Sequence, residues 1–139
     1  MKPTKTIFDS AAAVEAAFYS AFSRCDLAAM QDLWAGTDSV CIHPGAEAVK
    51  GYDAIVRSWE HIFRGAERPN VQINVIQIIA GDGLAVHVVE EHIGSSANPS
   101  HGAVVLATNV YRREDKGWLM VAHNASLVRV QQTQSHTLQ

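Results

Sequence analysis

The spacing of apolar residues changes at residues 65–70, and this change constrains the fold more than any other feature of the chain. Before it, apolar residues recur at i, i+3, i+4 and i+7, the spacing of an amphipathic helix. After it, apolar and polar residues alternate, the spacing of a half-buried strand. Helical segments followed by strands predict an α+β fold in which the helices cover one face of a curved, mostly antiparallel sheet.

Three helices are expected before the change, over residues 10–24, 27–34 and 53–63. We assign Thr6 and Asp9 as the capping pair of the first helix, and Asp26 as the N-cap of the second. A short strand is expected over residues 39–43, where Pro44 and Gly45 favour a turn. The layout leaves a cone-shaped cavity between the helices and the concave face of the sheet, a natural site for a small molecule.

Four longer strands are expected over residues 71–79, 84–93, 102–113 and 118–130. The alternation of the first slips at Val75 and Ile76, which predicts a β-bulge, because a one-residue slip would otherwise turn the strand onto its other face. Residues 131–139 have no periodicity and are expected to fray. We therefore predict a single domain over residues 1–139, with an ordered core of about residues 7–130.

Composition excludes several classes of function. With a net charge of −3 and a pI near 6.1, the chain lacks the basic excess of a nucleic-acid-binding surface. No apolar run approaches the roughly 20 residues of a membrane span, and acidic residues interrupt the N-terminal segment where a signal peptide would be apolar. Two cysteines, Cys25 and Cys41, form no disulfide framework. These features predict a cytoplasmic protein that binds neither membrane nor nucleic acid.

Five segments together resemble the nuclear transport factor 2-like superfamily, in its SnoaL-like, ketosteroid isomerase-related branch. They are residues 25–34 (CDLAAMQDLW), 40–45 (VCIHPG), 51–59 (GYDAIVRSW), 107–113 (ATNVYRR) and 117–126 (GWLMVAHNAS). The resemblance implies three N-terminal helices on a strongly curved sheet that encloses a pocket. It also implies a homodimer through the outer face of the sheet. Residues 103–110 are apolar on both faces for most of their length, and the helices can cover only one face, so a second copy is expected to cover the other.

The resemblance also implies where a site would lie. The isomerase tyrosine on the first helix corresponds to Phe18, with Tyr19 one step round the helix. The isomerase general base, an aspartate before a proline, corresponds to His43, and its second oxyanion donor corresponds to Asn109. All three roles are substituted, so steroid isomerisation by that mechanism is not expected. His43 remains a candidate acid or base, because imidazole exchanges protons near neutral pH.

Further candidate ligand-binding residues are aromatic or polar. Trp34 is expected in the core, and Trp59 and Phe63, at i and i+4, either pack there or roof the cavity. On the last strand we favour the side of Asn124 and Ser126 over that of His123. The complete set of candidate ligand-binding residues is Phe18, Tyr19, Trp34, Trp59, Phe63, Asn124 and Ser126.

The remaining histidines and cysteines are expected to be inert. His61 is expected on a helix surface, and His101 and His136 in solvent. On residues 87–91, histidine and glutamate share one strand face, which is either a pocket wall or a wet interface. Such a pair is weak evidence for a metal, so we expect no metal and no cofactor. Neither cysteine has an evident base beside it.

Three functions stay open at this stage. The first is a domain that binds a small, largely hydrophobic molecule in the cone pocket. The second is an isomerase or lyase in which His43 moves a proton on a carbonyl compound and Asn109 steadies the oxyanion. The third is a non-catalytic assembly module related to the kinase association domains, which would form oligomers larger than a dimer.

Overall fold

A computed structural model describes residues 6–65, 67–95 and 101–132. Its helices and strands in chain order are α1 (Ala11–Arg24), α2 (Leu27–Leu33), β1 (Val40–Ile42), β2 (Val49–Lys50), α3 (Tyr52–Gly65), β3 (Pro69–Ala80), β4 (Leu84–Ser95), β5 (His101–Glu114) and β6 (Gly117–Gln132). The helices and the long strands match the expected ranges to within two residues at every end.

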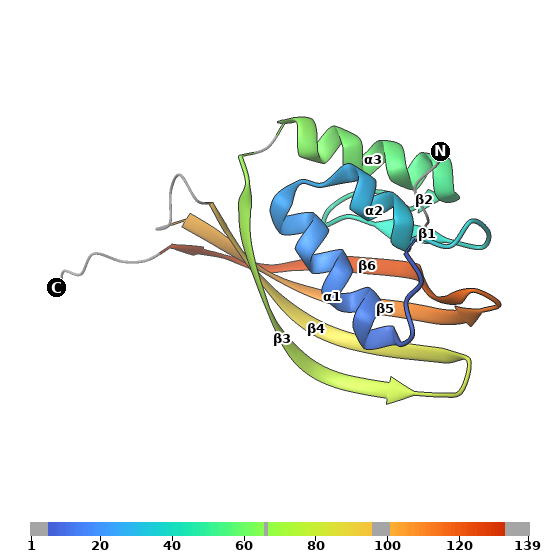
Figure 1. The fold of residues 1–139 in the computed structure, drawn as a ribbon. Helices are drawn as coiled ribbons and strands as arrows, with labels where there is room; N and C mark the ends of the chain where they lie inside the picture. Colours follow the sequence, from blue (N-terminus) through green and yellow to red (C-terminus); the bar gives the residue numbers. More distant parts are fainter. Residues whose placement is uncertain (1–5, 66, 96–100, 133–139) are drawn as a thin grey trace, which may run out of the picture.

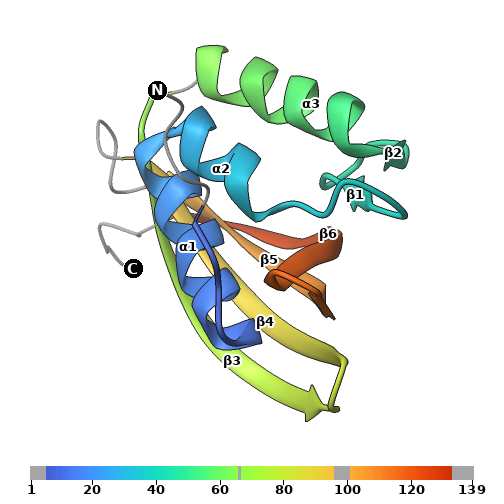
Figure 2. The ribbon, with the colours of Figure 1, turned by 45° about the vertical axis from the view of Figure 1, so that its right-hand side comes forward.

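The strands form one six-stranded sheet in the order β2-β1-β6-β5-β4-β3. The three helices lie on one face of it, and β3 and β4 bend beneath α1 (Figures 1 and 2). Neighbouring strands are antiparallel, except that β1 runs parallel to β6. The sheet is open, with β2 and β3 at its edges. The predicted α+β fold, with helices on a curved and mostly antiparallel sheet, is therefore confirmed.

The cap of α1 differs from the prediction. Ser10 is the N-cap, and its side-chain oxygen accepts a hydrogen bond from the Ala13 backbone N–H at 3.0 Å. Thr6 and Asp9 were the wrong pair, because the helix begins at Ala11 and the cap must directly precede it. The N-cap of α2 is Asp26, as predicted, and it accepts from the Ala29 N–H at 3.0 Å. This hydrogen bond is the main reason that the pKa of Asp26 is lowered.

The predicted bulge in β3 is confirmed, because the pairing of β3 with β4 shifts between Val75 and Gln77. Two features of the sheet were not predicted. One is β2, whose two residues are too few to show a period. The other is the parallel pairing of β1 with β6, which places Cys41 opposite His123 although 82 positions separate them in the sequence. That pairing decides which residues meet inside the cone.

The core lies between the helices and the inner face of the sheet. Phe18 of α1 and Trp59 of α3 are fully buried there, with their ring centroids 5.5 Å apart. The opposite face of the sheet has no helix over it in Figure 2, and there Leu106 of β5 is 41% exposed. Among the described helices, none is long and apolar enough to cross a membrane.

Gly117 allows the N-terminal segment to cross the β5–β6 turn. Its backbone has φ +111°, and the Phe8 carbonyl accepts a hydrogen bond from the Trp118 N–H at 2.8 Å. A Cβ at this position would lie 2.6 Å from the Phe8 oxygen. Glycine is therefore required both by the conformation and by the close approach of the backbone.

We predict that Gly117→Ala lowers the free energy of unfolding by about 1–3 kcal/mol, because the added methyl meets backbone and the φ is unfavourable. Urea denaturation measures the change. Gly83→Ala is the matched control, since a Cβ there meets nothing within 4 Å, and it is expected to stay within about 0.5 kcal/mol of the wild type. Equal stability of the two variants would contradict the prediction.

Candidate functional site

A chain of four buried polar side chains crosses the interior of the cone. The His123 ring lies with Nδ1 2.6 Å from Asn109 Oδ1, and Asn109 Nδ2 donates to the Tyr19 hydroxyl at 2.9 Å. The Tyr19 hydroxyl in turn donates to Glu91 Oε2 at 2.5 Å. All four side chains are buried, and Glu91 is only 1% exposed. We refer to Tyr19, Glu91, Asn109 and His123 as the polar chain.

The directions of these hydrogen bonds follow from one another. A carboxylate only accepts, so the Tyr19 hydroxyl donates to Glu91 and accepts from the Asn109 amide nitrogen. Asn109 Oδ1 is then the acceptor for His123, which must carry its proton on Nδ1. In the neutral ring, His123 Nε2 is therefore left with a lone pair. The hydrogen bonds of the polar chain are thus all donated in one direction, from His123 on β6 through Asn109 and Tyr19 to Glu91 on β4.

Two contacts between α1 and β4 fix one end of the polar chain. Glu15 and Tyr19 lie one turn apart on the same side of α1, and His87 and Glu91 lie on the same face of β4. Glu15 Oε2 is 2.9 Å from His87 Nδ1. This contact joins α1 to β4 in the same way as the Tyr19–Glu91 hydrogen bond, four residues earlier on both elements. Both pairs are buried, and together they set the position of α1 over β4.

The Glu91 carboxyl is strongly perturbed by its burial in the interior. Burial raises its pKa from 4.5 to about 7, and the hydrogen bond from Tyr19 offsets this only in part. Glu91 makes no ion pair with any residue that the structure describes. Burial also raises the pKa of Tyr19 and of Tyr111, so both phenols keep their protons. The carboxyl is therefore the acid here that changes charge near neutral pH.

His43 lies half-buried just after β1, and its tautomer is also fixed. Ser58 Oγ donates to the Ile55 carbonyl at 2.7 Å, so it accepts from His43 Nε2 at 3.0 Å. Burial lowers the pKa of His43. The pKa of His123 falls to about 3, mainly through burial and secondly through the charge of His43. At neutral pH both imidazoles are therefore neutral, and each has one nitrogen lone pair free of the bonds just described.

Aromatic rings pack around these histidines. Trp59 packs within 6.1 Å, between ring centroids, of Phe18, Phe22, His43, Phe63 and His123. The Trp59 indole nitrogen is buried without a hydrogen-bond partner, as is the Tyr111 hydroxyl. The Cys41 thiol lies 3.6 Å from His43 Nε2, and burial raises its pKa to about 12, so it stays protonated.

The structure brings together some of the candidate site residues and separates others. Tyr19, Asn109, Phe18, Trp59 and His43 meet in the interior, and Phe63 lies half-buried at its edge. Trp34 is fully buried in the core, with its ring centroid 6.5 Å from that of Phe18. In contrast, Asn124 and Ser126 are exposed, because β6 turns the side of His123 inward.

Sequence reasoning missed Glu91 and His123 as members of this site. Both residues are polar but lie on the mainly apolar, inward face of their strand. The alternation of apolar residues in β4 and β6 could have indicated this position. His61 is exposed, as expected. His136 and the side chain of His101 lie outside the described residues. In the described ranges, no three histidine, cysteine or acidic side chains are grouped so as to hold a metal.

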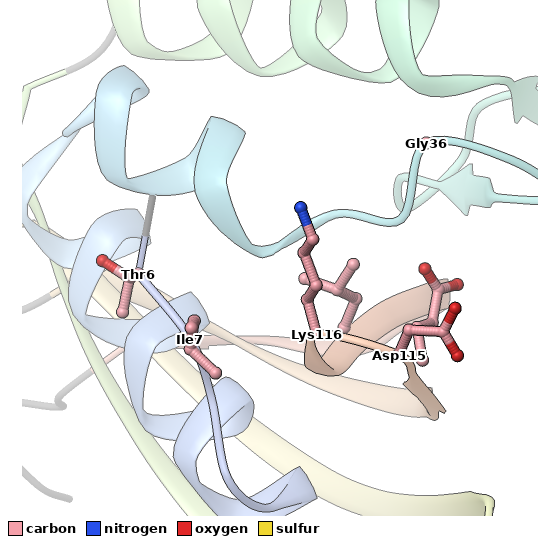
Figure 3. A pocket seen from close by; sticks show the side chains of 7 residues that line it. Thr6, Ile7, Gly36, Asp115 and Lys116 are labelled. Atoms are coloured by element: carbon pink, nitrogen blue, oxygen red, sulfur yellow. The ribbon is translucent and has the colours of Figure 1, made fainter. Parts of the chain in front are cut away.

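A separate hollow of about 840 Å³ lies between the N-terminal segment and the β5–β6 turn (Figure 3). Thr6 and Ile7 form one side of it, and the Lys116 side chain extends across it towards the loop that carries Gly36. It shares no lining residue with the polar chain. The hollow is therefore a surface feature of the turn and does not contribute to the buried cluster.

Three helices on an open, strongly bent sheet are the fold of the nuclear transport factor 2-like class. The chain belongs to the family of SnoaL-like domains, whose model matches residues 11–130.

Solved structures share both fold and sequence with this chain. A candidate calcium/calmodulin-dependent protein kinase type II association domain from Thiobacillus denitrificans ATCC 25259 is 35% identical, with a TM-score of 0.84, over 89% of this chain and 99% of that one. A candidate dehydratase of the NTF2-like family from Streptomyces avermitilis is 29% identical, with a TM-score of 0.76, over 84% and 91% of the two chains.

A curated relative is the F-box protein SKIP8 of Arabidopsis thaliana, 25% identical over 122 residues. The match covers 87% of this chain and 51% of that protein, so the chain spans about half the length of the relative. The likeness is therefore one between domains.

The raised pKa of Glu91 predicts a pH-dependent difference in stability. The carboxyl binds its proton more tightly in the folded state, so the folded state loses stability as the pH rises from about 4.5 to about 7. Glu91→Gln removes that titration. We expect the variant to gain stability over the wild type by about 3 kcal/mol between pH 4.5 and pH 8.

Urea denaturation of both proteins at these two pH values measures this gain. Glu47→Gln, at an exposed position, is the control and is expected to show no such trend. A difference between wild type and Glu91→Gln that stays constant with pH would mean that the carboxyl titrates normally.

Proposed function

We propose that this domain binds a small, largely apolar molecule in the interior of the cone, against the polar chain. The observation that carries the proposal is the Glu91 carboxyl, buried without a cation among the described residues. Burying an unpaired carboxyl opposes folding, and an interior selected for stability alone would be apolar there. Buried acids with a shifted pKa cluster at functional sites, which favours a binding role for this one.

The surroundings of the polar chain support an apolar ligand body. Trp59 and Phe18 supply aromatic surface at the centre of the cluster, while Phe22 and Phe63 lie half-buried at its edge. His43 is also half-buried, so this edge, between α3 and the end of β1, is where a ligand would reach the interior. A few polar groups within an apolar wall are typical of small-molecule sites.

Native mass spectrometry of the purified protein, followed by denaturing extraction, tests the proposal. We expect a protein peak that carries a bound small molecule, and an extract whose mass identifies it. Trp59→Ala removes the central ring and is expected to reduce the occupied fraction, whereas Trp118→Phe, at a half-buried position outside the polar chain, is expected to keep it. An empty protein that also binds none of a panel of small apolar compounds would contradict the proposal.

Catalysis at His43 is a second candidate function, favoured by its fixed tautomer. With Nε2 bonded to Ser58 and its pKa lowered by burial, the neutral ring presents Nδ1 as a base at neutral pH. An isomerase or lyase acting on a carbonyl compound would use it to move a proton. His43→Gln separates the two candidates, because ligand binding would survive where turnover of the extracted compound is lost.

We also propose a homodimer through the outer face of the sheet. Val86, Val88, Leu106 and Val110 lie on that face, half-buried or exposed, and a second copy would cover them. Leu106→Glu is expected to convert the dimer into a monomer in size-exclusion chromatography with light scattering. Ala16→Glu, at an exposed position of α1 on the other side of the sheet, is the control that is expected to stay dimeric.

The same measurement tests the assembly module, since one similar structure is a candidate kinase association domain. A wild-type particle larger than a dimer would favour assembly over ligand binding. A stable wild-type monomer at micromolar concentration would contradict the dimer.

A further inference from the structure

We propose that the ligand of the interior is an organic amine that binds as its ammonium form, with an apolar body against the aromatic rings. This inference rests on the proposed function and names its substrate class. It follows from the charges in the interior, from the groups left without partners and from the aromatic surface.

Among the described residues, the Glu91 carboxyl has no counter-charge beside it, whereas the other buried carboxyl, Glu15, is paired with His87. Glu91 is a carboxyl without an ion-pair partner in the described part of the chain, and the neighbouring His43 and His123 are neutral. The described lysine and arginine side chains are exposed, apart from Arg112, which is half-buried and paired with Glu114. A carboxylate or phosphate would therefore meet a like charge and no cation, whereas an ammonium would supply the missing counter-charge.

The polar groups left over in this region are mainly hydrogen-bond acceptors. His43 Nδ1, His123 Nε2 and Glu91 Oε1 receive no hydrogen bond from any described residue. Two donors are also unpartnered, the Trp59 indole N–H and the Tyr111 hydroxyl, and the latter can accept as well. An ammonium group carries up to three donors and no acceptor, so it fits a set dominated by acceptors.

The carboxyl and the aromatic rings belong to one connected region. Cys41 lies near both, because its thiol is 3.6 Å from His43 Nε2, and its pKa is raised mainly by burial and to a smaller extent by the charge of Glu91. His43 packs edge-on against Trp59, with centroids 4.9 Å apart. Among aromatic side chains, tryptophan attracts a cation to its ring face most strongly. An ammonium near Cys41 would therefore lie between the carboxyl and the indole.

The pH dependence of binding distinguishes an ammonium from other ligands. The titratable groups that face Glu91 are Tyr19 on α1, Cys41 on β1, Tyr111 on β5 and, through Asn109, His123 on β6. The phenols and the thiol keep their protons well above neutral pH, and His123 stays neutral well below it. Glu91 is thus the member of this group that ionises near pH 7, so ammonium binding should strengthen as the pH rises through that value.

Three probes with the same ring test the proposal by isothermal titration calorimetry at pH 8 and pH 5.5: benzylamine, benzyl alcohol and benzoate. We expect benzylamine to bind most tightly at pH 8, and to weaken by on the order of tenfold or more at pH 5.5. Glu91→Gln is expected to remove both this preference and its pH dependence, while benzyl alcohol still binds. Glu90→Gln, on the other face of the same strand, is the matched control and is expected to behave as the wild type.

Each outcome decides between the inference and the proposed function. Tighter binding of benzoate or of benzyl alcohol at pH 8 would overturn the amine and leave small-molecule binding intact. A preference for benzylamine that persists unchanged in Glu91→Gln would also overturn it, because the attraction would then come from elsewhere. If no probe binds and the native protein is empty by mass spectrometry, the proposed function fails, and the amine with it.

Discussion

The hydrogen bond from Tyr19 to Glu91 is the contact on which the interior depends. It joins α1 to β4 across the core, and one turn away the Glu15–His87 pair repeats the same connection. Apolar packing alone fixes the position of a helix over a sheet only loosely, because it is not directional. Two buried polar contacts with defined partners select one position, since any other would leave buried polar groups unpaired. The position of α1 in turn places Phe18 against Trp59 and His123.

The substitutions relative to the ketosteroid isomerase pattern gain a common explanation from the structure. Phe18 supplies ring surface, and the adjacent Tyr19 provides the hydroxyl that meets the sheet. Asn109 cannot titrate, and it uses both ends of its amide to connect His123 with Tyr19. The buried acid of this chain is instead Glu91, on the strand next to β5. In this chain the acid therefore lies on β4 and the amide on β5, and the Tyr19 hydroxyl on α1 is hydrogen-bonded to both.

The two faces of the sheet differ in the side chains that they carry. The inner face of β4 and β5 carries the polar groups and is covered by helices, whereas the outer face alternates with it and is apolar over Val86, Val88 and Leu106. In a sheet whose outer face is in contact with water, strands usually carry apolar side chains inward and polar side chains outward. β4 and β5 depart from this pattern, because buried polar groups lie on their inner face and apolar groups on their outer face. This arrangement agrees with the proposed binding site inside the cone and with the proposed dimer through the outer face of the sheet.

The sequence by itself determined the class of fold and most of its elements, because helical and strand periodicity are local properties. It also indicated the Asp26 cap and the bulge after Val75, and it singled out Tyr19, Asn109 and His43, which the structure brings together in the interior. Only the tertiary structure decided that His123 faces inward rather than Asn124, that Cys41 lies opposite His123, and that Glu91 receives the Tyr19 hydroxyl. Each of these depends on pairing between strands or helices far apart in the sequence. A strand's alternation defines two faces but not which one is covered, since that choice is made by whatever packs against it.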